Sequence, residues 1–263
     1  MYFGLSEDQI FFQDNVKKFL EDQLTLDTVR KITEGEDDLA KEELHKGLIN
    51  LGINNILVPE EHGGLGLDLL FATAVSQSLG EGVATLPFLG PYILAPTAIK
   101  YGASDSQKEK LFADMSQNLI NFGIGFSEYF GSRDSSGLNI SDNKVTGKTL
   151  FVLDTDFASH VMIADNKGQI GIVSLDSNDI EMIDLTTVDK TRTYKEMHFS
   201  DTPIEILDKT KSSSFAIEMA LDAGRIIAAA DSLGASQAMI NKAVEYSKER
   251  KQFNRVIGSF QAV

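Results

Sequence analysis

The sequence of 263 residues predicts an α+β protein with three successive regions: helices, then a small β domain, then one long helix. Apolar residues recur at helical spacing through residues 1–118. Residues 119–208 hold short runs rich in β-branched and aromatic residues, separated by Asp, Asn, Gly and Ser. Residues 209–263 return to an Ala-rich helical pattern. We expect these three ranges to be the domains of the chain.

The N-terminal region is predicted to contain several capped amphipathic helices. Ser6 and Gln9 have the spacing of a capping box, and apolar residues at helical spacing follow. A second helix, "AKEELHKGLINLGINNILVP", runs into a loop at Pro59. Further helices are expected over "LLFATAVSQSLGEG", capped by Asp68, over "ILAPTAIKYG", and over "SQKEKLFADMSQ", which Ser104 opens.

The middle region is predicted to be an antiparallel β-sandwich or barrel. Its expected strands include "KTLFVLD", "HVMIAD", "QIGIVSLD", "DIEMID" and "KEMHFSD". No helical pattern separates them, which argues against parallel βαβ units.

The C-terminal region is predicted to be one helix over "SSFAIEMALDAGRIIAAADSLGASQAMINKAVEYSKERKQF". This segment is apolar on most sides, as expected of a helix buried among other helices. Residues 247–263 then set basic residues between apolar ones at helical spacing, and the sequence stops among apolar residues with no Gly, Asn or Pro after them to close a helix. We therefore expect the packing partners of this helix to lie in sequence beyond Val263.

The composition excludes several classes of protein. With 24 basic and 39 acidic residues the net charge is −15, which argues against a general nucleic-acid or anionic-membrane binder. The absence of cysteine excludes disulfides, thiol nucleophiles and thiolate metal sites, and leaves the cytoplasm as the default compartment. The start, "MYFGLSEDQIFF", is not a secretory signal, and no apolar run approaches the ~18 residues of a spanning helix.

Two familiar kinds of site are also excluded. The glycines of "EEHGGLGLD" lack the third glycine of the dinucleotide motif, and a helix rather than a strand precedes them, so we interpret them as a turn. The four histidines are scattered without metal-ligand spacing, so we expect no metal site.

Three segments remain as candidates for chemistry. The loop "GFSEYFGSRDSSGL", residues 125–138, offers hydroxyls and backbone N–H groups to a phosphate or flavin edge, or is a plain polar loop. Asp222 and Arg225 share one face of an otherwise apolar helix, which favours either an internal ion pair or a ligand contact. "ERKQFNRVIGSFQ" sets guanidinium groups beside aromatic rings, which suits a pyrophosphate and adenine, or is a solvated basic helix end.

In this order and spacing, these segments resemble the acyl-CoA dehydrogenases. The family's Val-Pro-Glu-Glu stretch with Gly-Gly-Leu-Gly is here "VPEEHGGLGLD", and its Gly and Gln-Lys pattern is here "YGASDSQKEKLF". Its flavin loop corresponds to "FSEYFGSRDSSGL" and the end of its β domain to "VDKTRTYKEMHFSDTPIEIL". Its arginine motif corresponds to "RKQFNRVIGSFQ", so the resemblance covers the whole chain.

The resemblance implies a helical domain, a β domain and a C-terminal four-helix-bundle domain, with FAD between them and at a subunit interface of a homo- or hetero-oligomer. It also implies that a carboxylate removes the α-proton of an acyl-CoA thioester while the β-hydride passes to the flavin, giving a trans-enoyl-CoA. The electrons then usually leave to an electron-transferring flavoprotein.

The resemblance assigns the cofactor to two groups of residues. Ser127 takes the position of the Thr whose hydroxyl meets the flavin, and Phe126 precedes it beside the ring. Arg250, Phe253 and Gln261 match the positions that reach the FAD pyrophosphate and adenine of a neighbouring subunit.

The flavin site departs from the family pattern. Where the family has Pro-Gly-Ala-Gly-Ser-Asp, this chain has "YFGSRD". Without a gap, Arg133 replaces the phosphate-binding Ser; with a one-residue slip, slightly favoured, Ser132 keeps that role. Phe151 stands where a Trp usually covers the flavin. Leu153 stands where a Thr usually bonds its ring, which removes a hydrogen bond of about 1 kcal/mol.

The resemblance places Asp222 and Arg225 near the acyl chain, as candidate substrate-binding residues, but identifies no catalytic base. Some members carry the base as a Glu at the position of Gly224, which has no proton acceptor. Glu218 lies about 240° around the helix from Gly224. In most other members the base lies between later helices, so we expect it beyond Val263, with this chain truncated within its C-terminal domain.

Two alternatives to a dehydrogenase remain. The first is a non-catalytic partner subunit that holds part of a flavin or CoA site in a hetero-oligomer, which the altered flavin loop and Leu153 favour. The second is a flavin monooxygenase on the same fold, which needs no such Glu.

Overall fold

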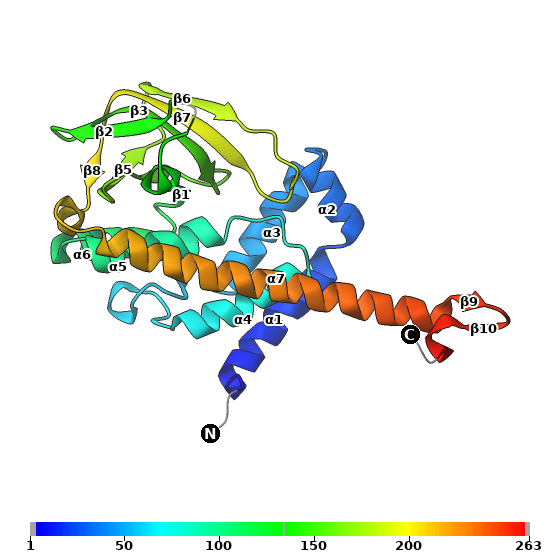
Figure 1. Ribbon diagram of the computed structural model, residues 1–263. Coiled ribbons are helices and arrows are strands. Elements are labelled where there is room, and N and C mark those ends of the chain that lie inside the picture. Colours follow the sequence, from blue (N-terminus) through cyan, green and yellow to red (C-terminus); the bar gives the residue numbers. More distant parts are fainter. Residues whose placement is uncertain (1–3, 134, 261–263) are drawn as a thin grey trace.

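The computed structural model describes residues 4–133 and 135–260. The predicted fold class is confirmed: an N-terminal helical domain and a β domain are followed by the first helix of a C-terminal helical domain. The sheet lies against the N-terminal helices, and the long helix α7 runs beside both and projects beyond them (Figure 1).

The elements have the following bounds. The N-terminal helices are α1 (Glu7–Gln23), α2 (Leu26–Thr33), α3 (Asp38–Asn50), α4 (Leu69–Glu81), α5 (Ala95–Gly102) and α6 (Asp105–Ser116). The strands are β1 (Phe122–Gly125), β2 (Gly137–Ser141), β3 (Lys144–Leu153), β4 (His160–Ala164), β5 (Ile170–Ser174), β6 (Ile180–Asp184), β7 (Tyr194–Pro203) and β8 (Glu205–Ile206). The C-terminal elements are α7 (Phe215–Glu249), β9 (Lys251–Gln252) and β10 (Arg255–Val256).

The predicted helix caps form as the sequence indicates. Ser6 and Gln9 make both bonds of a capping box, at 3.2 and 2.8 Å, and begin α1. Asp68 accepts two backbone N–H groups of α4, at 3.0 and 3.1 Å. The preceding glycine-rich stretch is the predicted turn, with Gly63 and Gly66 at positive φ. By contrast, α2 was not predicted, because eight residues carry too short an apolar pattern.

The β domain is one mixed sheet rather than a purely antiparallel one. Its order is β6-β7-β3-β1-β4-β5-β8, with β2 pairing β3. The predicted antiparallel pairing holds among the described strands except for β1 and β4, which run parallel. The pair β2–β3 and the connection over residues 154–159 bring the chain from β1 to β4, so no helical crossover is needed. The loop of residues 125–138 connects β1 to β2.

Helix α7 crosses α4 with the two backbones in contact. A Cβ atom added at Gly234 would lie 1.9 Å from the Gln77 carbonyl oxygen, and one added at Gly80 would lie 2.0 Å from the Asp231 carbonyl oxygen. The Ser76 hydroxyl donates to the carbonyl of Ile227 at 2.9 Å. Two glycines thus set the distance between α7 and the N-terminal domain.

The long helix differs from the prediction at its end and in its burial. It stops at Glu249, and residues 251–256 form a β-hairpin instead of a further turn of helix. Phe253 and Asn254 both have positive φ, at 51° and 62°, as a tight hairpin turn requires. Among the described residues, only one face of the helix is buried, the face that carries Ala223, Ile227 and their neighbours. The helix is therefore not covered on most sides.

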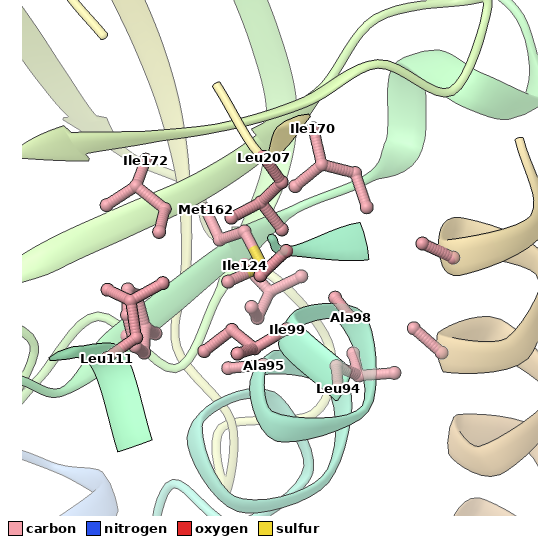
Figure 2. Close-up of a cluster of buried hydrophobic side chains, with 14 of the residues drawn as sticks. Leu94, Ala95, Ala98, Ile99, Leu111, Ile124, Met162, Ile170, Ile172 and Leu207 are labelled. Atoms are coloured by element: carbon pink, nitrogen blue, oxygen red, sulfur yellow. The ribbon is translucent and has the colours of Figure 1, made fainter. Parts of the chain in front are cut away.

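The main core lies between the sheet and the helices α5, α6 and α7. In Figure 2, Ile99 and Ala95 of α5 meet Ile124 and Met162 of the sheet. Gln107 joins this packing at its edge: its amide group donates to the Ile206 carbonyl at 2.9 Å and accepts from the backbone of the next segment. The β domain is thereby fixed to the N-terminal helices.

The glycine crossing generates a stability prediction. Gly234→Ala should lower the free energy of unfolding by about 1–3 kcal/mol, because a methyl group has no room against the Gln77 carbonyl. Helix propensity alone would raise the free energy of unfolding by about 1 kcal/mol. The sign of the measured change therefore shows whether the close contact or the propensity dominates. Urea denaturation followed by circular dichroism measures the change. The control is Ser236→Ala on the exposed face of α7, expected within about 0.5 kcal/mol of the parent.

Candidate functional site

A β-bulge in β3 forms the centre of the candidate site. The register of β3 against β7 shifts between Thr149 and Val152, so two residues, Leu150 and Phe151, bulge out of the ladder. Phe151 has φ 55°, a conformation that an aromatic residue rarely adopts, and its side chain is exposed. Strained, exposed aromatic residues of this kind are typical of ligand sites.

The buried carboxylate of Glu128 holds this bulge in place. It is 2% exposed and accepts the Leu150 N–H at 3.2 Å and the Ser136 hydroxyl at 2.7 Å. Ser127 lies beside it, and its hydroxyl donates to the Leu150 carbonyl at 2.5 Å. The loop of residues 125–138 is thus fixed to β3 by side chains that bond to both backbone groups of one residue, Leu150. Sequence reasoning did not single out Glu128, because its partners are not close in sequence.

The loop and the bulge together form a shallow aromatic shelf. We use this name for the surface formed by Ser127, Phe130, Gly131, Arg133 and Phe151, which lines a cavity of about 120 Å³. Phe130 is 61% exposed, and no atom lies within 4 Å of a Cβ built on Gly131. The cavity is smaller than the ~300 Å³ of a complete small-ligand site, so a ligand would need a second wall.

The structure separates the predicted cofactor residues of this loop. Ser127 and Arg133 line the shelf. Ser132 is exposed in the same loop but outside that lining. Phe126 is 4% exposed and packs in the core behind the shelf, which means that it supports the loop from within.

The charged pair on α7 does not reach the shelf. Asp222 and Arg225 bond to each other, and both side chains are more than 60% exposed. The pair therefore lies on an exposed face of α7 and not on a buried one. Between them, Gly224 faces the protein interior, where an added Cβ would lie 2.8 Å from Leu94. A side chain at position 224 would therefore require the Leu94 side chain to shift.

The predicted adenine-binding residues lie at the far end of α7. Figure 1 shows the hairpin of β9 and β10 at the opposite end of the helix from the β domain. Arg250 lies over the ring of Tyr246, 5.5 Å from its centroid, and Phe253 is 89% exposed. Gln261 lies outside the described residues. One chain therefore does not bring Arg250 and Phe253 to Ser127.

A second cavity lies where all three parts of the chain meet. We call it the interdomain pocket; it has a volume of about 230 Å³ and lies between the N-terminal domain, the end of β3, the β6–β7 loop and α7. Arg192 of that loop donates to the Leu86 carbonyl and to the Asp231 carboxylate, both at 3.3 Å. Sequence reasoning missed this pocket, because its walls come from segments far apart in the chain.

Asp154 is the most buried charged group of the interdomain pocket. It is 4% exposed, has φ 60°, and accepts the Gly90 N–H at 2.7 Å. Burial raises the pKa of Asp154 to about 6, although Arg192 and the Gly90 N–H oppose this shift. Burial also raises the pKa of Asp231, again opposed by Arg192.

Other kinds of site are not indicated within residues 4–133 and 135–260. These residues hold no cluster of His, Asp and Glu side chains able to bind a metal ion. The helices that the structure describes include none long and apolar enough to cross a membrane.

Two family models match the chain. "Acyl-CoA dehydrogenase, N-terminal domain" matches residues 6–118, and "Acyl-CoA dehydrogenase, C-terminal domain" matches residues 215–263. The 3-(aryl)acrylate reductase of Clostridium sporogenes is 27% identical, over 84% of this chain and 64% of that protein. A short-chain specific acyl-CoA dehydrogenase of Megasphaera elsdenii is also 27% identical, over 100% of this chain and 74% of that protein. The chain thus spans 64–74% of these relatives.

Solved structures share the fold over the whole chain. Butyryl-CoA dehydrogenase from Megasphaera elsdenii has a TM-score of 0.83 at 23% identity, with 100% of this chain and 74% of that one covered. A glutaryl-CoA dehydrogenase in complex with glutaryl-CoA has a TM-score of 0.83 at 22% identity, with 100% and 72% covered. At these identities the likeness shows the fold alone.

The buried carboxyl group generates a pH prediction. The folded chain keeps the Asp154 proton up to about pH 6, whereas the unfolded chain releases it near pH 4. The contribution of Asp154 to stability therefore falls as the pH rises through this window and is constant above it. The free energy of unfolding should fall between about pH 5.5 and about pH 7.5, and the fall should be about 1 kcal/mol larger for the parent than for Asp154→Asn. The Asn side chain keeps the bond to Gly90.

Urea denaturation at both pH values measures this difference. Asp142→Asn, in the exposed turn between β2 and β3, is the control and should follow the parent. Parallel pH profiles of the parent and Asp154→Asn would contradict the assignment.

Proposed function

Because this chain belongs to the acyl-CoA dehydrogenase family, a family of flavoprotein oxidoreductases, we propose that it provides the flavin-binding part of an FAD-dependent enzyme that dehydrogenates an acyl-CoA thioester between its α and β carbons. The observation that carries this proposal is the aromatic shelf, in which a clamped bulge presents Phe151 to solvent beside Arg133 and Ser127.

The residues of the shelf fit FAD chemically. Two exposed aromatic side chains, Phe130 and Phe151, suit a planar ring, and the guanidinium of Arg133 suits a phosphate. When bound, FAD supplies the acceptor for the hydride that leaves the β carbon. Ser127 donates its hydrogen to the Leu150 carbonyl, so it offers a lone pair to a ring N–H. Leu153 offers no hydrogen bond at the position where the family usually has one.

A second copy or a related chain would complete the site. The shelf is open, while Arg250 and Phe253 lie at the far end of α7, where Arg250 lies over Tyr246 and Phe253 packs edge-on against Phe260. We infer that the hairpin of one chain reaches the FAD held by another, in a homo- or hetero-oligomer. An electron-transferring flavoprotein is the acceptor that this function implies.

A non-catalytic partner subunit is the second candidate. It is favoured by Gly224, which offers no proton acceptor at the position where some family members carry the base, and by the fully engaged carboxylate of Glu128. Among the described residues we assign no catalytic base.

Flavin content and reduction test the proposal. The full-length protein should purify yellow, and its flavin absorbance should be bleached when its own acyl-CoA substrate is added under anaerobic conditions. Protein that retains FAD but is bleached by none of a panel of acyl-CoAs supports the partner subunit. Colourless protein that takes up no added FAD contradicts both.

The shared site generates a mutational prediction. Arg250→Ala should weaken FAD retention about tenfold or more, because it removes a charge-assisted bond to a phosphate. Equilibrium dialysis against FAD measures the effect. The control is Lys248→Ala, which removes a cation from the same end of α7 where it pairs with Glu245 at 2.8 Å. Equal FAD retention by the two variants would show that Arg250 does not contact FAD.

A further inference from the structure

We propose that Glu128 is a positioning residue of the flavin site. One oxygen of its buried carboxylate holds the bulge that presents Phe151, and the other holds the turn that carries Arg133, so that both halves of the aromatic shelf are in place before the cofactor binds. This inference rests on the proposed function, because it assumes that the aromatic shelf holds FAD.

The two halves of the aromatic shelf come from different segments of the chain. Phe151 belongs to the bulge of β3, whereas Arg133 belongs to the connection between β1 and β2. The described residues between 131 and 136, which we call the Arg133 turn, lie outside the helices and strands. Two of them, Gly131 and Ser135, have positive φ, at 119° and 61°. Because no sheet ladder holds these described residues, other contacts must fix the turn relative to the bulge.

One oxygen of the Glu128 carboxylate fixes the bulge. Oε1 accepts the N–H of Leu150, the residue directly before Phe151, at 3.2 Å. The Ser127 hydroxyl lies 3.2 Å from the same oxygen and donates to the Leu150 carbonyl at 2.5 Å. These bonds keep Phe151 in its strained conformation, with φ 55°, and its side chain exposed on the shelf.

The other oxygen of the Glu128 carboxylate fixes the Arg133 turn. Oε2 accepts the Ser136 hydroxyl at 2.7 Å, and the oxygen of that hydroxyl accepts the Arg133 N–H at 2.9 Å. The Ser136 N–H closes the turn by donating to the Arg133 carbonyl at 2.7 Å. A single side chain, 2% exposed, therefore links the backbone beside Phe151 to the backbone of Arg133. A charged acceptor suits this role, because its hydrogen bonds are stronger than those of a neutral one.

Holding both halves in advance favours the binding of a long, flexible ligand. Without the carboxylate, the turn and the bulge would have to be ordered when FAD binds, and this ordering would reduce the affinity. Glu128 itself lines the small cavity of the shelf, but both of its oxygens are already engaged. It therefore acts on the cofactor through Phe151 and Arg133.

Three substitutions in the full-length protein test this role by equilibrium dialysis against FAD. Glu128→Ala removes both links and should weaken FAD binding about tenfold or more. Glu128→Gln keeps an acceptor for the Leu150 N–H and can donate its amide N–H to the Ser136 oxygen, so its FAD affinity should stay within about threefold of the parent. Ser136→Ala removes only the link to the turn. It should weaken FAD binding but leave the absorbance spectrum of the bound flavin ring as in the parent. Ser141→Ala, at an exposed position of β2, is the control and should match the parent in both.

Hydrogen exchange of the FAD-free protein shows whether the links act before the cofactor binds. In Glu128→Ala, exchange should become faster in peptides that cover residues 127–136 and 148–153, and should stay unchanged in peptides that cover α4. A general loss of stability would instead speed exchange throughout the protein, and that result would overturn the positioning role.

The outcomes separate this inference from the proposed function. Parent-like FAD affinity in either Glu128→Ala or Ser136→Ala overturns the positioning role and leaves the flavin function standing. A Glu128→Gln variant that binds FAD as weakly as Glu128→Ala also overturns it, because the bonding geometry would not then account for the effect. If Glu128→Ala does not fold, the affinities of Glu128→Gln and Ser136→Ala decide in the same way. Parent protein that takes up no FAD overturns both the inference and the proposed function.

Discussion

The backbone contact between α4 and α7 is the constraint on which the rest of the structure depends. At Gly80 and Gly234 the helices approach so closely that neither position has room for a methyl group. Ser76 adds a hydrogen bond to the Ile227 carbonyl at the same crossing. The crossing fixes the face of α7 that carries Ile227 and Asp231, and with it one wall of the interdomain pocket. The aromatic shelf, in contrast, depends on contacts within the β domain.

Two strained residues mark the end of β3, where the two cavities come closest. Phe151 and Asp154 both have positive φ and are held by contacts with other segments: Glu128 and Ser127 fix the bulge, and the Gly90 N–H fixes Asp154. Leu153 lies between them. Backbone strain of this kind persists only where surrounding contacts enforce it. The strand thus supplies the shelf on one side and the pocket on the other.

Local signals made much of the fold predictable, and long-range contacts explain what was missed. The caps at Ser6 and Asp68 and the change from helical to strand periodicity involve neighbours in sequence, so they could be read directly. The parallel pairing of β1 with β4 could not, because it depends on where distant strands lie. For the site, Ser127, Arg133 and Phe151 could be singled out, whereas Glu128, Asp154 and Arg192 matter through partners that only the folded chain brings together.

The part of α7 beyond the glycine crossing projects from the rest of the described chain, so a small change of angle at the crossing moves its end by a large distance. From Gly234 to Glu249 the helix extends about 24 Å, at 1.5 Å per residue, and the described chain covers little of this length. A tilt of about 10° at the crossing would therefore displace the hairpin by about 4 Å. In the oligomer proposed above, the point at which Arg250 and Phe253 meet a neighbouring molecule would therefore depend on the close contact of α7 with α4 at Gly80 and Gly234.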